Sequence, residues 1–567
     1  MKLKRFPSIL GRLFVSLVLM FLLFYTTLPA VNLKNRGFFM FVISCILIFL
    51  VVNFLSYVKN LLQSLGNRRT SISRDPVTGQ YIYRKDETGE TSSEKISLAK
   101  PLKYGFLAIG ILILFMVIAS VIGNRFFNAS RYRDLITITD GDFTTDVSEL
   151  NMSQIPVVDR DTATQLGSRK LGEMTDLVSQ FEIEPNYTQI NYKGSPYRVT
   201  PLTYADPIKW LYNQSKGLPA YITVDMVNQD TELVWLDQGM RYSPGEYFFR
   251  NIYRYMRFRY PTKMFETVSF EIDEDGVPYW VAPVITYRIG WWDGKDISGA
   301  ILVNAVTGES QYYDKSEVPT WIDQLYNSDL IIEQLDDNGK FQNGYFNSIF
   351  GQRNVRRTTY GYNYLAIGDD VYLYTGMSSV TADESNIGFV LVNLRTKATK
   401  FYAVPGATEY SAMESAKGQV QHLNYTATFP LLLNISDRPT YFVSLKDAAG
   451  LVKMYAFVDV KQYQIVGTGS TVDEAKRNYR QALNLEDNEP SVPKDLINMS
   501  GTISAIADVV VSGNTCYYFT LEGSDEVYTV AVTVSEKLPF IKAGDKVDFT
   551  YSLYYQVKTI SELKLQP

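Results

Sequence analysis

Three long apolar runs occupy most of the first 123 residues of the chain. They cover Leu13–Val31, Gly37–Val58 and Tyr104–Gly123, and the last run holds twenty residues without one charge. A helix rises about 1.5 Å per residue, so each run can cross a hydrocarbon core about 30 Å thick. The first run also matches the apolar part of a signal peptide, but its length and the second run close behind it favour an uncleaved helix. The pattern predicts three transmembrane helices.

Basic residues are distributed unevenly around these runs. Four precede the first run, nine lie between the second and third runs, and only Lys34 and Arg36 lie between the first and second. Loops rich in lysine and arginine stay in the cytoplasm. We therefore expect a cytoplasmic N-terminus, a cytoplasmic loop at 59–103 and an extracytoplasmic region at 124–567, anchored in the cytoplasmic membrane.

The composition changes after residue 123. Residues 124–567 hold 55 of the 60 acidic residues but only 40 of the 55 basic ones, which argues against a nucleic-acid partner. Cys45 lies in the second apolar run, so Cys516 is the one cysteine of the exported region and no disulfide can form within it. This suits the envelope of a Gram-positive bacterium better than a disulfide-rich animal ectodomain.

A pattern of apolar strand, Val-Asp or Val-Asn, turn, apolar strand and helix occurs four times in the exported region. Its anchors are Val224, Val303, Val392 and Val458, which lie 79, 89 and 66 residues apart. A hairpin backed by one helix cannot bury both faces alone, so we expect an α+β region of stacked repeats over 124–484. Each Asp or Asn should close the turn on its own backbone, and each valine should be buried.

Smaller elements are predicted between these repeats. Arg131–Ile138 and Phe143–Val147 have strand-like composition, whereas Thr162–Phe181 has helical periodicity, with Asp159 or Asp161 as its cap. In the loop at 59–103, a turn and a short strand are expected over Asp75–Tyr83.

The second repeat resembles PepSY-type modules of bacterial extracytoplasmic proteins. The resemblance rests on Tyr279–Val284, Ala300–Asn304, Ala305–Glu309 and Tyr312-Tyr313, and it is partial in the third and fourth repeats. It implies a strand, a hairpin with the motif V-[DN]-x-x-T-G-x and a packed helix. PepSY-type modules are implicated in peptidase inhibition or envelope regulation, but a fold does not fix a function.

A polar hinge at 485–494 separates the repeats from a C-terminal segment at 495–567. Five strands are expected there, with a connector between the third and fourth, and this arrangement resembles an OB-fold barrel. Such barrels often bind single-stranded nucleic acid through basic grooves. Acids outnumber bases in this segment, so we expect contact with a protein or a glycan instead.

Catalytic motifs are scarce. His422 is the single histidine, no G-x-S-x-G nucleophile motif is present, and one histidine with one exported cysteine cannot fill a usual zinc site. Asp273–Gly276 and Asp336–Gly339 are expected to be turns rather than catalytic acids. The sequence predicts no catalytic residue, no cofactor and no metal ligand.

One segment, Tyr247–Tyr260, combines aromatic residues with arginines. Arg250, Arg254 and Arg257 lie at i, i+4 and i+7, on one face of a predicted helix. They are candidate ligands for an anionic polymer or a partner. The alternative is that they form ion pairs with acids of the same protein, in which case they serve the fold.

Together these patterns predict a non-enzymatic binding or scaffold protein of the cell envelope. Its expected parts are two transmembrane helices at 1–58, a cytoplasmic loop at 59–103, a third helix at 104–123, α+β PepSY-like repeats at 124–484, a hinge at 485–494 and an OB-like five-stranded barrel at 495–567. The partners would be the membrane and an envelope protein or glycan. The alternatives are a regulator of an exported peptidase and a carboxylate-dependent wall hydrolase.

Overall fold

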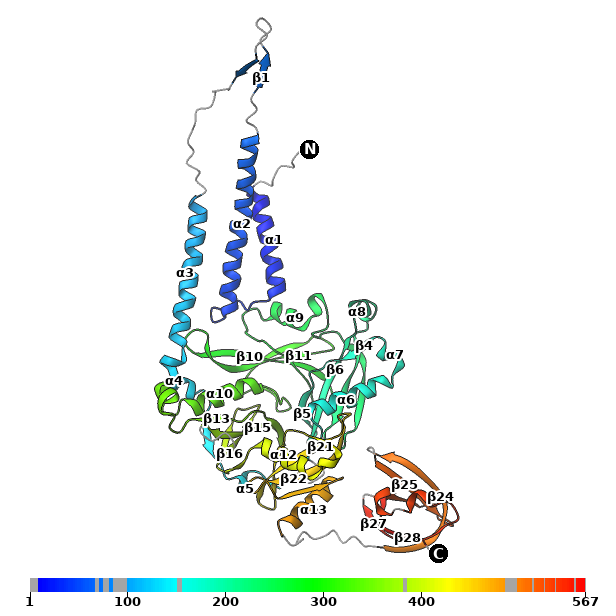
Figure 1. Ribbon diagram of the computed structural model, residues 1–567. Helices are drawn as coiled ribbons and strands as arrows, with labels where there is room; N and C mark the ends of the chain where they lie inside the picture. Colours follow the sequence, from blue (N-terminus) through cyan, green and yellow to red (C-terminus); the bar gives the residue numbers. More distant parts are fainter. Residues whose placement is uncertain are drawn as a thin grey trace. The chain divides into compact units, whose positions relative to one another are not determined.

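The computed structural model describes residues 9–66, 71–74, 81–84, 99–149, 155–380, 385–484, 497–511, 514–524, 526–535, 537–554 and 557–565. The chain forms two compact units. Unit 1 comprises Met1–Asp142 and Ala163–Val404, and unit 2 comprises Phe143–Thr162 and Pro405–Pro567. Both units mix helices with β-sheets (Figure 1).

Three long apolar helices belong to unit 1. They are α1 (Ile9–Thr27), α2 (Arg36–Gly66) and α3 (Ala99–Gly123). Each contains a segment long and apolar enough to cross a membrane, at Leu10–Thr27, Arg36–Phe54 and Leu102–Gly123. The prediction of three such helices is confirmed. Between α2 and α3, strand β1 (Ser71–Arg74) pairs with strand β2 (Tyr81–Arg84). The strand expected at the end of Asp75–Tyr83 lies in β2, and the turn expected before it lies outside the described residues.

Four sheets follow in chain order, three in unit 1 and the fourth in unit 2, and the strands named here pair with antiparallel neighbours. The first comprises β4 (Phe181–Ile183), β5 (Thr188–Tyr192), β6 (Ser195–Tyr204), β7 (Leu218–Asp225) and β8 (Thr231–Met240). The second comprises β9 (Ser269–Ile272), β10 (Pro278–Ile289), β11 (Asp293–Asn304) and β12 (Ser310–Asp314). The third is seven-stranded and includes β13 (Arg356–Thr358), β14 (Asn363–Ile367), β15 (Asp370–Ser379), β16 (Ser385–Asn393) and β17 (Thr399–Tyr402). The fourth comprises β19 (Thr426–Ala427), β20 (Leu431–Ile435), β21 (Arg438–Lys446), β22 (Val452–Asp459) and β23 (Val466–Gly469).

The same turn follows an inner strand of every one of these sheets. A side-chain oxygen of the last strand residue accepts the N–H groups two and three residues further on, at 2.7–3.1 Å; these residues are Asp225, Asn304, Asn393 and Asp459. In the first three turns the fourth residue after the anchor is left-handed, with φ of 65° at Gln229, 77° at Gly308 and 64° at Lys397. The preceding valines of all four strands are fully buried. The predictions about these turns and valines are confirmed.

Helices cover the sheets and complete their cores. In unit 1, α10 (Ser328–Lys340) inserts Leu330, Ile331 and Leu335 among buried residues of the second and third sheets, including Val281 and Val390. The other helices of this unit, besides α1 to α3, are α4 (Arg125–Arg133), α6 (Arg160–Gly172, which begins in unit 2), α7 (Thr175–Val178), α8 (Pro207–Asn213), α9 (Ile252–Arg259) and α11 (Gly344–Phe346), with short turns η2 (Phe248–Arg250) and η3 (Asn347–Gly351). In unit 2, α12 (Glu409–Gln419) and α13 (Val472–Ala482) pack on the fourth sheet.

The C-terminal part of unit 2 is a closed ring of strands. Its order is β24 (Ile497–Val511), β25 (Asn514–Leu521), β26 (Val527–Ala531), β28 (Val557–Leu565) and β27 (Lys546–Tyr554), which returns to β24. All neighbours are antiparallel except β26 and β28. Aromatic rings of Phe519, Tyr528 and Phe549 fill its interior. The connector between β26 and β27 holds the short turns η5 (Val532–Val534) and η6 (Leu538–Phe540).

Three local predictions were wrong. Arg131–Ile138 is not a strand: its first three residues end helix α4 (Arg125–Arg133), which Asn124 caps by accepting the Phe126 N–H at 2.8 Å, and a turn follows. The strand is only β3 (Ile138–Asp140), which pairs in parallel with β17. Phe143–Val147 forms the helical turn α5 (Phe143–Asp146). The helix expected at Thr162–Phe181 ends at Gly172, because Met174 is non-helical and Phe181 joins β4. Its expected cap, Asp159, does accept the Thr162 N–H.

Candidate functional site

The predicted arginine face lies against the end of α1. Arg257 donates to the carbonyl oxygen of Leu28 at 2.9 Å and to that of Lys263 at 2.6 Å. Arg254 donates to Phe248 O at 2.7 Å, and its guanidinium lies 4.0 Å from the centre of the Tyr25 ring. Arg250 donates to Gln214 O at 2.5 Å. Only 4% of Arg257 is exposed, so the three guanidinium groups do not form one open surface.

These partners have a physical reason. The last four carbonyl groups of a helix accept no hydrogen bond from N–H groups of that helix, and the helix dipole makes the C-terminus attractive to cations. α1 ends at Thr27, next to the carbonyl that Arg257 binds. Burial lowers the pKa of Arg257 to about 10, which still leaves it charged at neutral pH. Carbonyl oxygens therefore take the place that the fold-serving alternative gives to Asp and Glu side chains.

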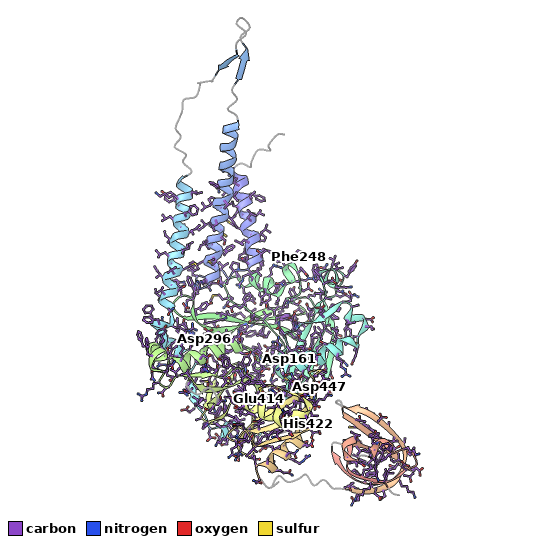
Figure 2. The ribbon with its side chains drawn as sticks, viewed as in Figure 1. Asp161, Phe248, Asp296, Glu414, His422 and Asp447 are labelled. Atoms are coloured by element: carbon purple, nitrogen blue, oxygen red, sulfur yellow. The ribbon has the colours of Figure 1, made fainter. Side chains whose placement is uncertain are left out.

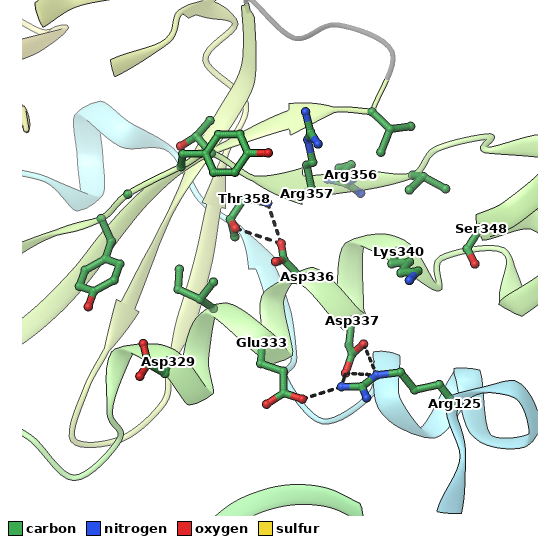
Figure 3. A pocket seen from close by; sticks show the side chains of 17 residues that line it. Arg125, Asp329, Glu333, Asp336, Asp337, Lys340, Ser348, Arg356, Arg357 and Thr358 are labelled. Atoms are coloured by element: carbon green, nitrogen blue, oxygen red, sulfur yellow. Dashed lines mark hydrogen bonds and ion pairs between the residues drawn. The ribbon is translucent and has the colours of Figure 1, made fainter. Parts of the chain in front are cut away.

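A separate pocket of about 940 Å³ opens beside α10 in unit 1; we call it the α10 pocket. Figure 3 shows that its lining comes from α4, α10, η3, β13 and the segment after β13. The lining residues with charged side chains are Arg125, Asp329, Glu333, Asp336, Asp337, Lys340, Arg356 and Arg357. Hydroxyl groups come from Ser348, Thr358, Thr359, Tyr360 and Tyr362. Three lining residues have aliphatic side chains: Ile332, Val355 and Val380.

The amphipathic pattern of α10 creates one wall of this pocket. Asn327 starts the helix by accepting the Leu330 N–H at 2.9 Å. The apolar face of α10 is buried in the core, so the acidic residues of the other face line the pocket. A Cβ at Gly339 would lie 2.4 Å from the carbonyl oxygen of Arg356, and only glycine allows α10 to approach β13 this closely.

Two carboxylates of this wall are bound by one arginine. Arg125 donates to both oxygens of Asp337, at 2.8 and 2.9 Å, and to Glu333 at 2.5 Å (Figure 3). Arg125 begins α4, two residues after α3 ends. The hydrogen bond to Asp337 is the largest cause that raises the pKa of Arg125. The ion pairs thereby link the wall of the pocket to the end of α3.

The third carboxylate faces β13. Asp336 accepts the backbone N–H of Thr358 at 2.8 Å and its hydroxyl at 3.0 Å, and burial raises the pKa of Asp336. Asp329 lies exposed nearer the start of α10. On the rim opposite, 75% of Tyr360 is exposed, and Tyr362 is also open to solvent. The open part of the pocket thus offers carboxylates, cations and tyrosine rings together.

Unit 1 also holds two carboxyl groups away from the pocket, and both are fully buried. Glu271 on β9 accepts the Ser269 hydroxyl at 2.8 Å and the Asp323 N–H at 2.9 Å. Asp323 accepts the Asn191 N–H at 2.6 Å through Oδ2, while its Oδ1 has no hydrogen-bond partner among the described residues. Burial raises the pKa of Glu271 to about 7, and burial with the nearby Glu271 raises the pKa of Asp323 well above its usual range.

The remaining candidates for chemistry lie apart. Among the described residues, no group of three or more His, Cys, Asp or Glu side chains is placed to hold a metal ion. His422 is exposed on η4 (Gln421–Leu423) in unit 2, where Figure 2 labels it. The chemistry available in the described residues is therefore richest in the α10 pocket.

The sequence does not predict this pocket, because the composition of Asp336–Gly339 indicates a turn. That assignment was wrong: all four residues belong to α10, whose cap and apolar face outweigh the turn preference of Asn338-Gly339. The similar run Asp273–Gly276 is a turn as predicted, with Asp273 accepting the N–H groups of Asp275 and Val277. The signal available was the spacing of Leu330, Ile331 and Leu335, which puts the acids on one helical face.

Comparison with known proteins assigns no family. No protein-family model matches the chain, and no curated protein matches it. Among solved structures, the chain is similar to a levansucrase mutant from B. megaterium, with 9% sequence identity and a TM-score of 0.17. The match covers 76% of this chain and 98% of that one. At this TM-score the likeness carries no argument about fold or function.

Proposed function

We propose that the protein is a membrane-anchored, non-enzymatic binding or scaffold protein of the cell envelope, and that the α10 pocket holds a glycan strand. The observation that carries this proposal is the lining of the pocket. The cores of protein interfaces are apolar and poor in charged residues, whereas this pocket is lined by charged and hydroxyl groups with exposed tyrosines at its rim. Such groups suit a polar polymer.

The state of the carboxylates supports binding rather than hydrolysis. Hydrolysis of glycosides uses one carboxylic acid and one carboxylate on opposite sides of the scissile bond. Here Glu333 and Asp337 are held by one arginine, and Asp336 by Thr358. All three carboxylates come from one wall, the helix α10. A wall hydrolase therefore stays the less favoured alternative, and release of sugars from purified cell wall would establish it.

The proposal includes the orientation of the protein in the membrane. The unequal distribution of lysine and arginine around the spans supports a cytoplasmic N-terminus and an extracytoplasmic region from residue 124 onward, in a Gram-positive envelope. Three helices able to span a membrane are present. Cysteines introduced at Ser92 and Ser470 should then differ in intact cells: an impermeant thiol reagent should label position 470 and not position 92.

We also propose a finer description of the fold. The shared Asp/Asn turns support four PepSY-like modules, and the strand order β24-β25-β26-β28-β27 supports an OB-like barrel. The PepSY resemblance carries the other alternative, a regulator of an exported peptidase. Inhibition of casein hydrolysis by a peptidase captured from detergent-solubilised membranes would favour this alternative over glycan binding.

Co-sedimentation of the detergent-solubilised full-length protein with purified Gram-positive wall polysaccharide tests glycan binding. The double variant Asp329→Ala, Tyr360→Ala should bind at least about tenfold more weakly, which corresponds to about 1.4 kcal/mol. Tyr463 is an exposed tyrosine of unit 2, outside the α10 pocket. The variant Tyr463→Ala is the matched control and should bind as the wild type does. Equal binding by the double variant and the wild type would contradict the assignment of this pocket.

A further inference from the structure

The parts of unit 1 that contact the ends of the transmembrane helices also carry clusters of exposed aromatic and aliphatic side chains. One patch lies on α8 and η2 and consists of Ile208, Leu211, Tyr212, Phe248 and Phe249. The other lies on α4, α11 and η3 and consists of Phe127, Phe346, Ile349 and Phe350. We call the two patches together the collar. Large exposed apolar patches on a protein mark an interaction surface.

The first patch is tied to the end of α1. The ring of Phe249 lies 5.7 Å from that of Tyr25, and Phe258 lies 5.6 Å from Phe24. The N–H of Val31, just beyond α1, donates to the carbonyl of Pro261 at 2.7 Å. Together with the arginine contacts described above, these interactions fix η2 and α9 within side-chain reach of the end of the first span.

A buried carboxylate just before η2 holds helix α8 next to η2. Glu246 accepts the indole N–H of Trp210 at 2.7 Å and the hydroxyl of Tyr204 at 2.8 Å. Trp210 therefore points inward, while the other side of α8 exposes 64% of Ile208, 59% of Leu211 and 79% of Tyr212. The helix is amphipathic, and none of the described residues of unit 1 covers its apolar side.

Backbone strain in η2 turns further rings outward. Phe248 has a φ of +51°, a left-handed conformation that is rare for a bulky residue. Its neighbour Phe249 is exposed as well, and Figure 2 labels Phe248 on the side of unit 1 where α1 ends. A strained backbone that exposes apolar rings has no benefit in water, so it points to an apolar environment.

The second patch is tied to the end of α3. Tyr132 of α4 donates to the carbonyl of Gly123, the last residue of α3, at 3.0 Å. Asn128 donates to Ile122 O at 2.6 Å. The ring of Phe126 lies 5.6 Å from that of Phe346, so α11 follows α4 to this position. Beyond it, 80% of Phe350 is exposed.

A hairpin of the second sheet joins the two patches. At one end, Trp291 donates to Leu33 O at 2.8 Å, and the ring of Trp292 lies between Phe39 of α2 and Phe115 of α3. At the other end, the hydroxyl of Tyr255 on α9 donates to Gly308 O, just after β11. In Figure 1, β10 and β11 run across beneath the ends of the three helices. The collar therefore lies at the level where the spans leave the hydrocarbon core.

We propose that the collar inserts into the interfacial region of the bilayer and holds the folded part of unit 1 flat against the lipid surface. Its two patches are tied to the ends of α1 and α3, so the occupant that covers them is lipid. Tryptophan, tyrosine and phenylalanine near span ends match the composition of membrane interfaces. Exposed basic side chains at Lys216, Arg241 and Arg259 suit anionic headgroups.

Lipid quenching of fluorescence in nanodiscs tests the proposal. The full-length chain, with Cys45→Ser and Cys516→Ser, carries one nitrobenzoxadiazole label at Tyr212→Cys or Phe350→Cys, and the bilayer contains phosphatidylglycerol, phosphatidylcholine and a nitroxide-labelled phospholipid. Ile111→Cys within α3 is the positive control. Tyr360→Cys is the aqueous control, since it is equally exposed and follows β13, which Figure 1 places below α10 and away from the spans.

Labels at positions 212 and 350 should emit at shorter wavelength than the label at 360 and should lose at least about half of their fluorescence to the nitroxide lipid, as side chains in an interface do. Quenching no stronger than at position 360 would overturn the proposal. A label that is shielded but not quenched by lipid, and whose shielding falls on dilution, would show that a second copy of the chain covers the collar, and this would also overturn it.

Discussion

The buried carboxyl Glu271 makes the stability of unit 1 depend on pH. Its pKa rises from 4.5 to about 7 because the side chain is fully buried between Ser269 and Asp323. Between these two pH values the folded protein keeps a proton that the unfolded chain releases. The stabilisation is therefore complete below pH 4.5 and is lost as the pH rises through 7.

The size of this effect follows from the same two pKa values. Each pH unit between them corresponds to about 1.4 kcal/mol, so raising the pH from 4.5 to 8 should lower the free energy of unfolding by about 3 kcal/mol through Glu271 alone. Asp323 shifts in the same direction and adds to the loss. The nearest charged groups to Asp323 are Glu271, Asp369, Asp370 and Arg395.

Glu271→Gln should remove most of this dependence. An amide has the shape of the protonated acid, and its NH₂ group can donate to the Ser269 hydroxyl in place of the acid proton. Thermal unfolding of the detergent-solubilised protein from pH 5 to pH 8, followed by tryptophan fluorescence, should show a smaller fall in Tm for the variant. Glu274→Gln, an exposed acid in the next turn, is the control and should follow the wild type. Parallel pH profiles of Glu271→Gln and wild type would refute the reasoning.

Three further changes test the packing of unit 1, each by the midpoint of urea unfolding in detergent. Gly308→Ala should destabilise by about 1–3 kcal/mol, because the residue is left-handed and a Cβ would lie 2.4 Å from the Tyr242 ring; an unchanged midpoint would contradict the turn geometry. Arg257→Gln should cost about 1–3 kcal/mol by removing the donors to two half-buried carbonyl oxygens, whereas the exposed Arg259→Gln should cost less than about 0.5 kcal/mol; equal effects would argue against the contact with α1. Val303→Ala should cost about 1–3 kcal/mol from lost burial and a residual cavity, and a neutral result would show that the repeat anchor is not packed.

Features governed by neighbours in the chain could be predicted from the sequence. The spans follow from length and hydropathy alone. The turns at Asn304 and Asn393 follow from the reach of an Asn side chain to the N–H groups two and three residues later. The burial of Val303 follows from its place near the end of an apolar inner strand.

Features that depend on distant segments could not be predicted. Asp336 and Asp337 look like turn residues until α10 is placed between two sheets, and their partners Thr358 and Arg125 are 22 and 212 residues away in the chain. For the arginine face the sequence leaves open an anionic ligand or acidic partners of the same protein, because it gives no sign that the end of α1, 229 residues away in the chain, is in contact with Arg257. Patterns in a single sequence do not show which distant segments of the chain are in contact.

A photo-crosslinking amino acid in place of Tyr360 tests the central claim most directly. In intact cells, irradiation should attach this position to a carbohydrate-containing adduct, detectable by mass spectrometry of the residue 357–395 peptides. The same probe at Tyr463 serves as the control and should give no carbohydrate adduct. A pocket that binds an envelope glycan predicts sugar attached at position 360 and not at 463. Protein adducts alone at position 360, or no adduct at all, would contradict the account.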